Sequence, residues 1–415
     1  MHATAFFTEM LEKRRNGAHT GIYSVCSANP YVLRAAIEQG AEDGAHVLIE
    51  ATANQVNQFG GYTGMKPGDF YDFVYGLAAE YGFPSEDVIL GGDHLGPLVW
   101  KDKTEPEAMA LAEELVAAYV SAGFSKIHLD TSMKLAGDSA DAPLSDETIA
   151  LRGARLCAAA EKACIPGKLP VYVLGSEVPT PGGSREKMKS ITPTAPCEFL
   201  SSYRAYKDAF LSAGLSGAFS RVVAFVVQPG VEFNDNEVFE YDRSATEELC
   251  QALCRLPEPL VFEGHSTDYQ TAYSLKRLVE DGVAILKVGP ALTYALHCGI
   301  KALEDTERAL AVQKGLAPSR FTETLEEAMF KNDVHWKNYY PGTPEQQRMR
   351  MRFSLFDRAR YYLSEPEVDS ALKTLILNIE KTGAVSASPD DYLISNVRDC
   401  LKAYSAAVQN REMVV

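Results

Sequence analysis

The sequence predicts a (β/α)8 barrel, the TIM-barrel fold of the α/β class, followed by a C-terminal helical extension. Eight short β-branched runs recur along residues 21–290, and amphipathic helical stretches lie between them. The runs VVAFVV and AILKV are mostly apolar rather than alternating, which is typical of parallel strands covered on both faces. Eight such repeats over about 290 residues match a barrel in number and length. A doubly wound open sheet is the alternative, but VCSANP at the first strand end is not a glycine-rich phosphate turn.

The elements of the barrel follow from these runs. The predicted strands are Gly21–Cys26, His46–Ala51, Asp87–Gly92, Lys126–Asp130, Val171–Gly175, Val222–Val227, Leu260–Glu263 and Ala284–Val288. The predicted helices between them include Thr104–Ala122, Ser145–Ala163, Pro196–Ala213, Ala245–Arg255 and Asp268–Glu280. Ser145 is a candidate N-cap, and acidic residues follow it in the first turn, where the helix dipole favours them.

Residues 315–415 contain no further strand-like run and read as helices. These are Glu323–Phe330, Glu345–Leu363, Glu367–Glu380 and Ser388–Gln409. Ser388 is a plausible N-cap, with Pro389 at the first helical position. No Gly/Ser-rich linker precedes the region. We therefore expect a barrel domain at 1–314 and a helical extension at 315–415 that packs on it.

Composition narrows the class of protein. The 415 residues are 46% apolar and 23% charged, as in an ordinary globular protein, and the formal net charge is −16. This acidity argues against nucleic-acid binding, because a broad basic face is lacking. We find neither a signal peptide nor an apolar run of about 18 residues, so we expect no membrane span. The eight scattered cysteines predict reduced, mostly buried thiols and a cytoplasmic location.

Polar side chains stand at nearly every predicted strand end. In a (β/α)8 barrel the catalytic groups lie at the C-terminal ends of the strands. Any one such residue is more often a cap or a loop hydrogen bond, whereas the whole set favours a site. The candidates there are Ser27, Glu50, Asn54, Gln55, Gln58, Asp93, His94, Asp130, Glu177, Gln228, His265, Ser266 and Lys287.

The segment GGDHLGP carries the sharpest signal. It delivers Asp93 and His94 side by side at the third strand end, where a turn just beyond the strand can aim both at the barrel mouth. His94 suits a divalent metal and Asp93 a general base. His265 ends the seventh strand, across the barrel from the third, so both histidines could bind one ion. Glu177 is either a metal-associated carboxylate or a loop cap, and the loop after it could close over a substrate. Gln228 is a weaker, neutral metal ligand.

Other segments indicate the substrate. The run EATANQVNQ places Glu50, Asn54, Gln55 and Gln58 together, and amides suit a vicinal polyol or can stabilise their own loop. The arginine-rich segment 340–362 could bind phosphate through Arg358, although solvated helix faces or subunit contacts explain it equally well. The sequence has no GxGxxG, GxxxxGK[ST] or GxSxG motif. Lys287 leaves a metal-free, Schiff-base aldolase as an alternative.

Long segments of the chain resemble one known family. They are SVCSANP, LIEATANQVNQFGGYTGM, ILGGDHLGP, GFSKIHLDTSM, VVQPGVEF, HSTDYQT, LKVGPALT and FSLFDRARYY. They are similar to the accessory (Z-type) subunit family of class II D-tagatose-1,6-bisphosphate aldolase. The resemblance implies a TIM barrel related to class II aldolases and a place in galactitol or N-acetylgalactosamine breakdown, by tagatose 6-phosphate degradation.

The resemblance also implies roles. Class II aldolases have a catalytic Asp followed by a zinc His, matching Asp93 and His94, a last zinc His matching His265, and a metal-associated Glu resembling Glu177. At the sixth strand, where those enzymes have a further zinc His, this chain has Gln228, and their glycine-rich phosphate loop is replaced by HSTD. We expect a divalent metal, Zn²⁺ first and Mn²⁺ or Ni²⁺ as alternatives.

Two functions fit this resemblance. The first is a metal-dependent ketose 4-epimerase or aldolase-type lyase acting at C3–C4 of a ketohexose or ketohexose phosphate. Its catalytic residues are Asp93, Glu177 and Asp130, and its metal ligands are His94, His265, Glu177 and Gln228. Its substrate-binding residues are Ser27, Glu50, Asn54, Gln55, Gln58, Ser266, Lys287 and Arg358. The second is a non-catalytic subunit that stabilises and activates a separate class II aldolase. We expect a homo-oligomer in either case.

Overall fold

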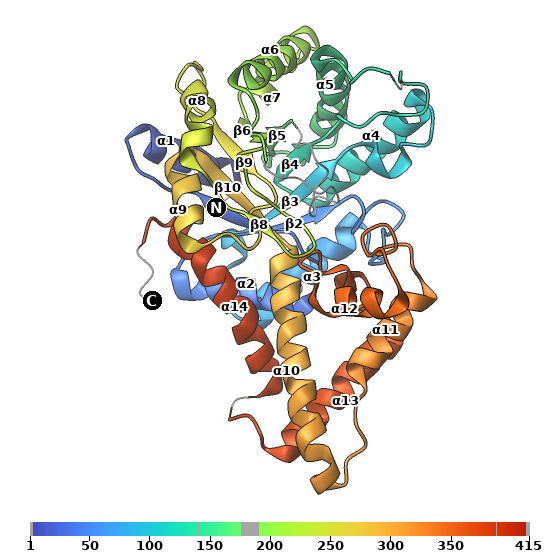
Figure 1. Ribbon diagram of the computed structural model, residues 1–415. Helices are drawn as coiled ribbons and strands as arrows, with labels where there is room; N and C mark the ends of the chain where they lie inside the picture. The colour runs from blue at the N-terminus through green and yellow to red at the C-terminus, as the bar shows by residue number, and fades with distance from the viewer. Residues whose placement is uncertain (1–2, 140, 176–190, 387, 412–415) are drawn as a thin grey trace.

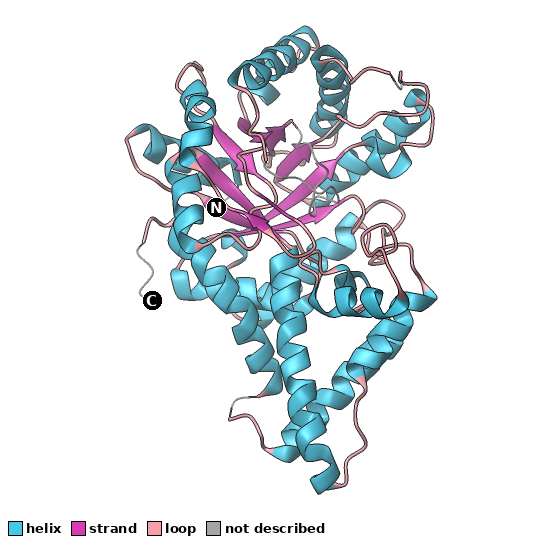
Figure 2. Cartoon of the chain, viewed as in Figure 1, coloured by secondary structure: helices cyan, strands magenta, loops and turns pink. Residues whose placement is uncertain are grey.

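The structure is a closed barrel of eight parallel strands, confirming the predicted fold (Figures 1 and 2). The computed structural model describes residues 3–139, 141–175, 191–386 and 388–411. The strands are β1 (Ile22–Val25), β2 (Val47–Thr52), β3 (Val88–Leu95), β4 (Lys126–Leu129), β5 (Val171–Leu174), β6 (Val222–Val227), β9 (Val261–Gly264) and β10 (Val283–Val288). Each coincides with one predicted run, and β10 pairs with β1 to close the ring.

Helices surround this barrel, as Figure 2 shows in cyan. They are α2 (Pro30–Asp43), α3 (Pro67–Glu80), α4 (Glu105–Ala122), α5 (Asp146–Lys162), α6 (Pro196–Ser212), α7 (Ser216–Phe219), α8 (Arg243–Leu253) and α9 (Ala272–Glu280). The Ser145 hydroxyl accepts the N–H of Thr148, so the predicted N-cap of α5 is confirmed. The predicted helix from Asp268 is wrong at its start, because α9 begins at Ala272 and Asp268 is a buried loop residue. A short hairpin, β7 (Glu232–Phe233) with β8 (Val238–Phe239), follows β6 and was not predicted.

The N-terminal helix α1 (Ala3–Arg15) covers the start of the strands. Its residues Phe7 and Met10 share one apolar cluster with inward-facing strand residues such as Ile22 and Ile89. The end of the barrel opposite the strand carboxyl termini is thus filled by side chains, which leaves the carboxyl end as the place for a site.

The C-terminal region is helical, as predicted. It contains α10 (Pro290–Lys314), α11 (Phe321–Lys331), α12 (Pro344–Phe353) and α13 (Pro366–Thr382), followed by α14 (Pro389–Val408). Figure 1 shows α10, α11 and α13 extending away from the barrel. The division of the chain at 314/315 stays a prediction. The predicted helix Glu345–Leu363 is wrong beyond Phe353, because the chain leaves the helix at Ser354 and forms only a 3-10 turn, Arg358–Tyr361.

Helix α14 returns to the barrel and packs between α9 and α2, against β1. The Ser388 hydroxyl caps it through the N–H of Asp391, as predicted. At its other end the Tyr404 hydroxyl donates to the carbonyl of Thr267 at 2.6 Å, and the Gly21 N–H donates to the carbonyl of Val408 at 2.9 Å. The last helix of the chain therefore completes the ring of helices around the barrel.

Two expectations from composition bear on this structure. No helix in the described part of the chain is long and apolar enough to cross a membrane. All eight cysteines are free thiols, but the expectation that most are buried is wrong, since only Cys157 is fully buried and three are exposed.

Candidate metal centre and substrate cavity

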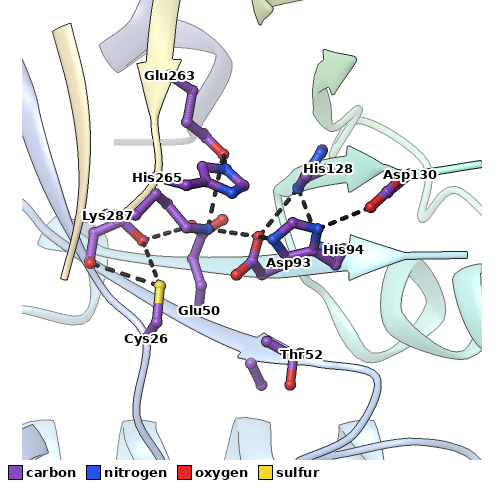
Figure 3. Close-up of polar contacts among 12 residues, drawn as sticks. Cys26, Glu50, Thr52, Asp93, His94, His128, Asp130, Glu263, His265 and Lys287 are labelled. Carbon is purple, nitrogen blue, oxygen red and sulfur yellow. Dashed lines mark hydrogen bonds and ion pairs between the residues drawn. The ribbon is translucent and has the colours of Figure 1, made fainter. Parts of the chain in front are cut away.

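The third strand delivers both Asp93 and His94 to the barrel mouth by a bulge. Strand β3 continues to Leu95, and its register with β4 shifts between Gly92 and Leu95. His94 adopts a left-handed backbone with φ +47°, which a non-glycine residue holds only at a cost of about 1–3 kcal/mol. The distortion breaks the in–out alternation of the strand, so that two neighbouring side chains turn to the same centre (Figure 3). The predicted turn beyond the strand is therefore a bulge within it.

Three histidines and one carboxylate converge there. Asp93, His94, His128 and His265 are all buried, and each offers a ligand atom within 4.8 Å of the others. The centroid of the His94 ring lies 4.7 Å from the centroid of the His128 ring and 4.7 Å from that of the His265 ring. These residues come from β3, β4 and the loop after β9 (Figure 3). The predicted meeting of His94 with His265 is confirmed, and His128 is an imidazole that the prediction missed.

An oxygen atom behind each imidazole sets its orientation. The Nδ1 of His94 lies 2.9 Å from Asp130 Oδ2, and the Nε2 of His265 lies 3.0 Å from Glu263 Oε1. The Nε2 of His128 lies 3.0 Å from the Gly175 carbonyl, so this nitrogen carries the proton. Within the described residues, the buried Nε2 of His94 has no hydrogen-bond partner. Such carboxylate or carbonyl partners are what metal-ligating histidines use to fix the tautomer and ring direction.

A buried network of ion pairs supports the cluster from below. The Lys126 ammonium lies 2.6 Å from Glu50 Oε1 and 2.5 Å from Glu263 Oε2, and all three side chains are 0% exposed. Lys287 pairs with Glu50 and lies 2.7 Å from Asp93 Oδ1. Glu50 therefore lies between two lysines, and each charged side chain of the network has a partner of opposite charge.

The charged side chains of the centre carry a net negative charge. The carboxylates are Glu50, Asp93, Asp130 and Glu263, and the ammonium groups are Lys126 and Lys287. Four negative and two positive groups leave a formal charge of −2 when the imidazoles are neutral. Buried charge of one sign is costly without a counter-ion. A divalent cation would supply the missing charge.

The titration properties bear on this arrangement. Burial opposes protonation of His94, but the carboxylates of Asp93 and Asp130 raise its pKa, so a metal competes with a proton at this ring. Burial opposes ionisation of Asp93, but the Lys287 ammonium and His94 hold its pKa well below its ordinary value. Burial also acts to raise the pKa of Asp130, but the hydrogen bond from His94 outweighs this effect and lowers the pKa to about 2. Burial lowers the pKa of His265 to about 3, so this ring is neutral and able to bind a metal at physiological pH. The residues present therefore fit a divalent transition metal held by imidazole nitrogens, with the Asp93 carboxylate beside it.

A cavity of about 180 Å³ opens beside the cluster. Seven of the predicted site residues line it, namely Asn54, Gln55, Asp93, His94, His265, Ser266 and Lys287. Tyr62, Asp268, Arg360 and Tyr361 also face this space. Amides, hydroxyls and one guanidinium among the described residues thus line the cavity next to the metal centre, which suits a small polyhydroxylated ligand.

Several predicted residues lie elsewhere. Glu50 and Asp130 lie behind the cluster, and the Ser27 hydroxyl accepts the N–H of Asn29 in a second cavity. The Gln58 amide donates to the Leu111 carbonyl. The Gln228 Oε1 accepts the N–H groups of Gly230 and Val231, shaping the turn after β6 instead of joining the histidines. Glu177 and its loop lie outside the described residues.

Arg358 also misses the cavity, and Arg360 takes its place. Because α12 ends early, the chain turns at Asp357 with φ +42° into the 3-10 turn. Arg358 then donates to the His335 carbonyl and lies over the ring of Tyr339, with 3.9 Å to its centroid. Two residues on, Arg360 faces the cavity. The prediction assumed one continuous helix, which would have placed these arginines differently.

Comparison with known proteins finds a matching family and a similar fold. The family model D-tagatose-1,6-bisphosphate aldolase subunit GatZ/KbaZ-like matches residues 7–414. Subunits GatZ of this aldolase from Salmonella heidelberg (strain SL476) and Salmonella gallinarum (strain 287/91) are each 42% identical over 95% of this chain and 97% of theirs.

A solved structure is similar over nearly the same range. It is that of a probable tagatose 6 phosphate kinase from Sinorhizobium meliloti 1021, with 43% identity and a TM-score of 0.83. The match covers 93% of this chain and 100% of the other. The chain belongs to the GatZ/KbaZ-like family of D-tagatose-1,6-bisphosphate aldolase subunits.

Proposed function

We propose that this protein is a metal-dependent enzyme that acts at C3–C4 of a ketohexose or ketohexose phosphate and inverts C4 by retro-aldol and aldol steps. The observation that carries the proposal is the convergence of three histidines and Asp93 on one buried centre beside the polar cavity. A scaffold without turnover has no need for three oriented imidazoles around a charge deficit of two.

The histidines would hold the metal. His94 and His265 are oriented by carboxylates, and His128 would exchange its hydrogen bond from the His94 N–H for the metal. A divalent metal bound there acts as a Lewis acid toward the ketose carbonyl oxygen. Zn²⁺ suits this donor set first, and Mn²⁺ and Ni²⁺ are the alternatives.

Asp93 would serve as the base. It is ionised, because the Lys287 ammonium lies 2.7 Å from its carboxylate. Asp93 accepts the proton of the C4 hydroxyl, the C3–C4 bond breaks, and its electron pair passes to the C1–C3 fragment as an enediolate. The C4–C6 fragment is an aldehyde. If this aldehyde turns over, bond formation on its other face inverts C4, and Asp93 returns the proton.

The cavity walls would bind the sugar hydroxyls. Asn54 and Gln55 offer amide donors and acceptors, and Ser266 offers a hydroxyl. Glu177 remains a predicted second carboxylate for catalysis or metal binding. We further propose a cytoplasmic location and a homo-oligomeric state, as expected for a sugar-degrading enzyme of this family.

An assay of the purified chain alone tests the proposal. The protein is stripped with a chelator, reloaded with Zn²⁺, Mn²⁺ or Ni²⁺, and supplied with tagatose, fructose and their 6-phosphates. We expect C4 epimers to form, and D93N, H94A and H128A to lower kcat by about 100-fold or more. The exposed residues Asp102 and His19 provide the matched controls D102N and H19A. No turnover with any metal, or full turnover in the site variants, contradicts the proposal.

A second function has its own support. Both GatZ relatives are described as subunits of an aldolase, and they match nearly the whole chain. The chain would then bind and stabilise a separate class II aldolase, with or without turnover of its own. Co-expression of the two proteins checks this: we expect co-purification and a longer half-life of the partner's activity. A partner that neither co-purifies nor gains stability would exclude this function.

A further inference from the structure

One arginine faces the cavity without a carboxylate partner. The Arg360 guanidinium donates to the backbone carbonyls of Phe356 and Asp357 and, at 3.2 Å, to the Tyr361 hydroxyl. It lies 4.6 Å from the centroid of the Tyr361 ring. Within the described residues, Arg360 forms no ion pair. All of its hydrogen-bond partners are neutral groups. The carboxylates of Asp357 and Asp268 act on its charge, but both lie beyond ion-pair distance, and Arg360 lines a partly enclosed space.

Three other arginines of the same segment each have a carboxylate partner. Arg348 and Arg352 each pair with Glu326, and Arg350 pairs with Asp235. These three residues line neither the cavity beside the histidines nor the one next to it. Unlike these three arginines, Arg360 lines the cavity and has no carboxylate within ion-pair distance among the described residues. An arginine left without a carboxylate is suited to receive an anionic ligand, because its fork binds oxyanions in a bidentate manner.

Arg360 borders two cavities. It is shared with a second cavity of about 280 Å³, together with Gln55 and Tyr62. Asp93, His94 and His265 line the first cavity only. A ketose with its carbonyl end at the histidines would therefore extend its far end toward Arg360. The Tyr62 and Tyr361 hydroxyls lie on the same wall and add donors for an oxyanion with three oxygens.

The other positive groups around the cavity are already engaged. Lys287 pairs with Glu50 and Asp93. The N-terminus of α10 also lines the cavity, but the Asp268 carboxylate accepts the N–H groups of Gly289 and Ala291 there, at 3.0 and 2.8 Å. A carboxylate in that position repels a second anion. The described part of the cavity thus offers one place for an anionic group outside the metal centre.

We propose that Arg360 binds the phosphate of a ketohexose phosphate esterified at the end of the sugar away from the carbonyl. The proposal rests on the proposed function for the position of the carbonyl end. It narrows the substrate class from ketohexoses and their phosphates to the phosphate esters. It assigns the phosphate to Arg360 and not to the predicted Arg358 or to the N-terminus of α10.

Ligand binding tests this independently of turnover. Inorganic phosphate, fructose 6-phosphate and fructose 1,6-bisphosphate are titrated into the metal-loaded full chain by calorimetry. We expect R360Q to weaken the binding of phosphate and fructose 6-phosphate by about 10- to 100-fold, because a charge-assisted bidentate contact is lost. R360K should lose less. Binding of the bisphosphate should depend on Arg360 in the same way.

The matched control is Arg358, which carries the same charge two residues away and touches neither cavity. R358Q should change phosphate affinity by less than about threefold. If R360Q fails to fold, R360K still decides, because it keeps the charge but not the fork. Unchanged binding of phosphate and fructose 6-phosphate by R360Q would overturn the proposal. If only R360K folds, binding equal to that of the wild type would overturn it.

Kinetics separate this inference from the proposed function. R360Q should raise KM for the 6-phosphate by about 10- to 100-fold and leave the KM for unphosphorylated fructose nearly unchanged. Arg360-dependent phosphate binding without any sugar turnover would refute the proposed function and keep the anion site. Turnover with no dependence on Arg360 would do the reverse.

Discussion

Replacing Lys126 with methionine should strongly destabilise the barrel. The Lys126 ammonium is fully buried, 2.6 Å from a Glu50 oxygen and 2.5 Å from a Glu263 oxygen. Methionine has a similar length but no charge, so K126M leaves two buried carboxylates short of one cation. Removing one partner of a buried pair costs about 3–5 kcal/mol. Glu50 keeps Lys287 and Glu263 keeps His265, so we expect a loss within that range and not twice as large.

Urea unfolding measures this loss. The transition is followed by circular dichroism and by fluorescence, whose coincidence establishes two-state behaviour before free energies of unfolding are compared. The exposed Lys101 provides the control K101M, which should change the free energy by less than about 0.5 kcal/mol. Adding E50Q removes one excess negative charge, so the double variant K126M/E50Q should be more stable than K126M. A loss below about 1 kcal/mol in K126M, or a double variant less stable than the single one, would refute the reasoning.

Three further predictions address the site, its pH dependence and the C-terminal helix. D130N should weaken metal binding by about 10- to 100-fold in chelator competition, because Asp130 orients His94, whereas D102N should not; equal affinities would contradict this. Burial raises the pKa of Glu232 from 4.5 to about 7, so the native state holds its proton more tightly and stability falls as pH rises between those values. E232Q should remove about 3 kcal/mol of that fall in urea titrations at pH 5 and pH 8, and an unchanged pH dependence would disprove it. Truncation after residue 386 removes α14, and since that helix covers β1, we expect aggregation on expression; a monomeric, folded fragment would show that the barrel closes without it.

The fold could be predicted because its signals are local. Apolar β-branched runs and amphipathic stretches recur in the order that a barrel needs, and caps such as Ser145 and Ser388 mark helix starts directly. What failed depends on tertiary contacts. The helix through Ser354 has good periodicity, yet packing of the following segment around Asp357 ends it. The hairpin after β6 has two-residue strands, too short to leave a pattern.

The site was only partly predictable, because Lys126 and His128 lie within a strand and not at its end. In the strand KIHLD, the polar residues Lys126, His128 and Asp130 alternate with apolar ones, which is the pattern of one strand face. A barrel strand has its inner face lined by such residues, so this alternation places all three inside. The signal was present, since a lysine and a histidine on the inner face of a buried strand require partners. Glu263 and His265 repeat the same spacing at β9.

His128 also changes what Gln228 implies. A glutamine at the sixth strand suggests a weakened metal centre only if the third imidazole has to come from that strand. Here β4 supplies it, next to β3 in the barrel, and the ring of His128 lies 4.7 Å from that of His94. The third imidazole therefore comes from β4, and Gln228 caps the turn after β6. With a charge deficit of two beneath these rings, the absence of a histidine at the end of β6 is no argument against a metal in this chain.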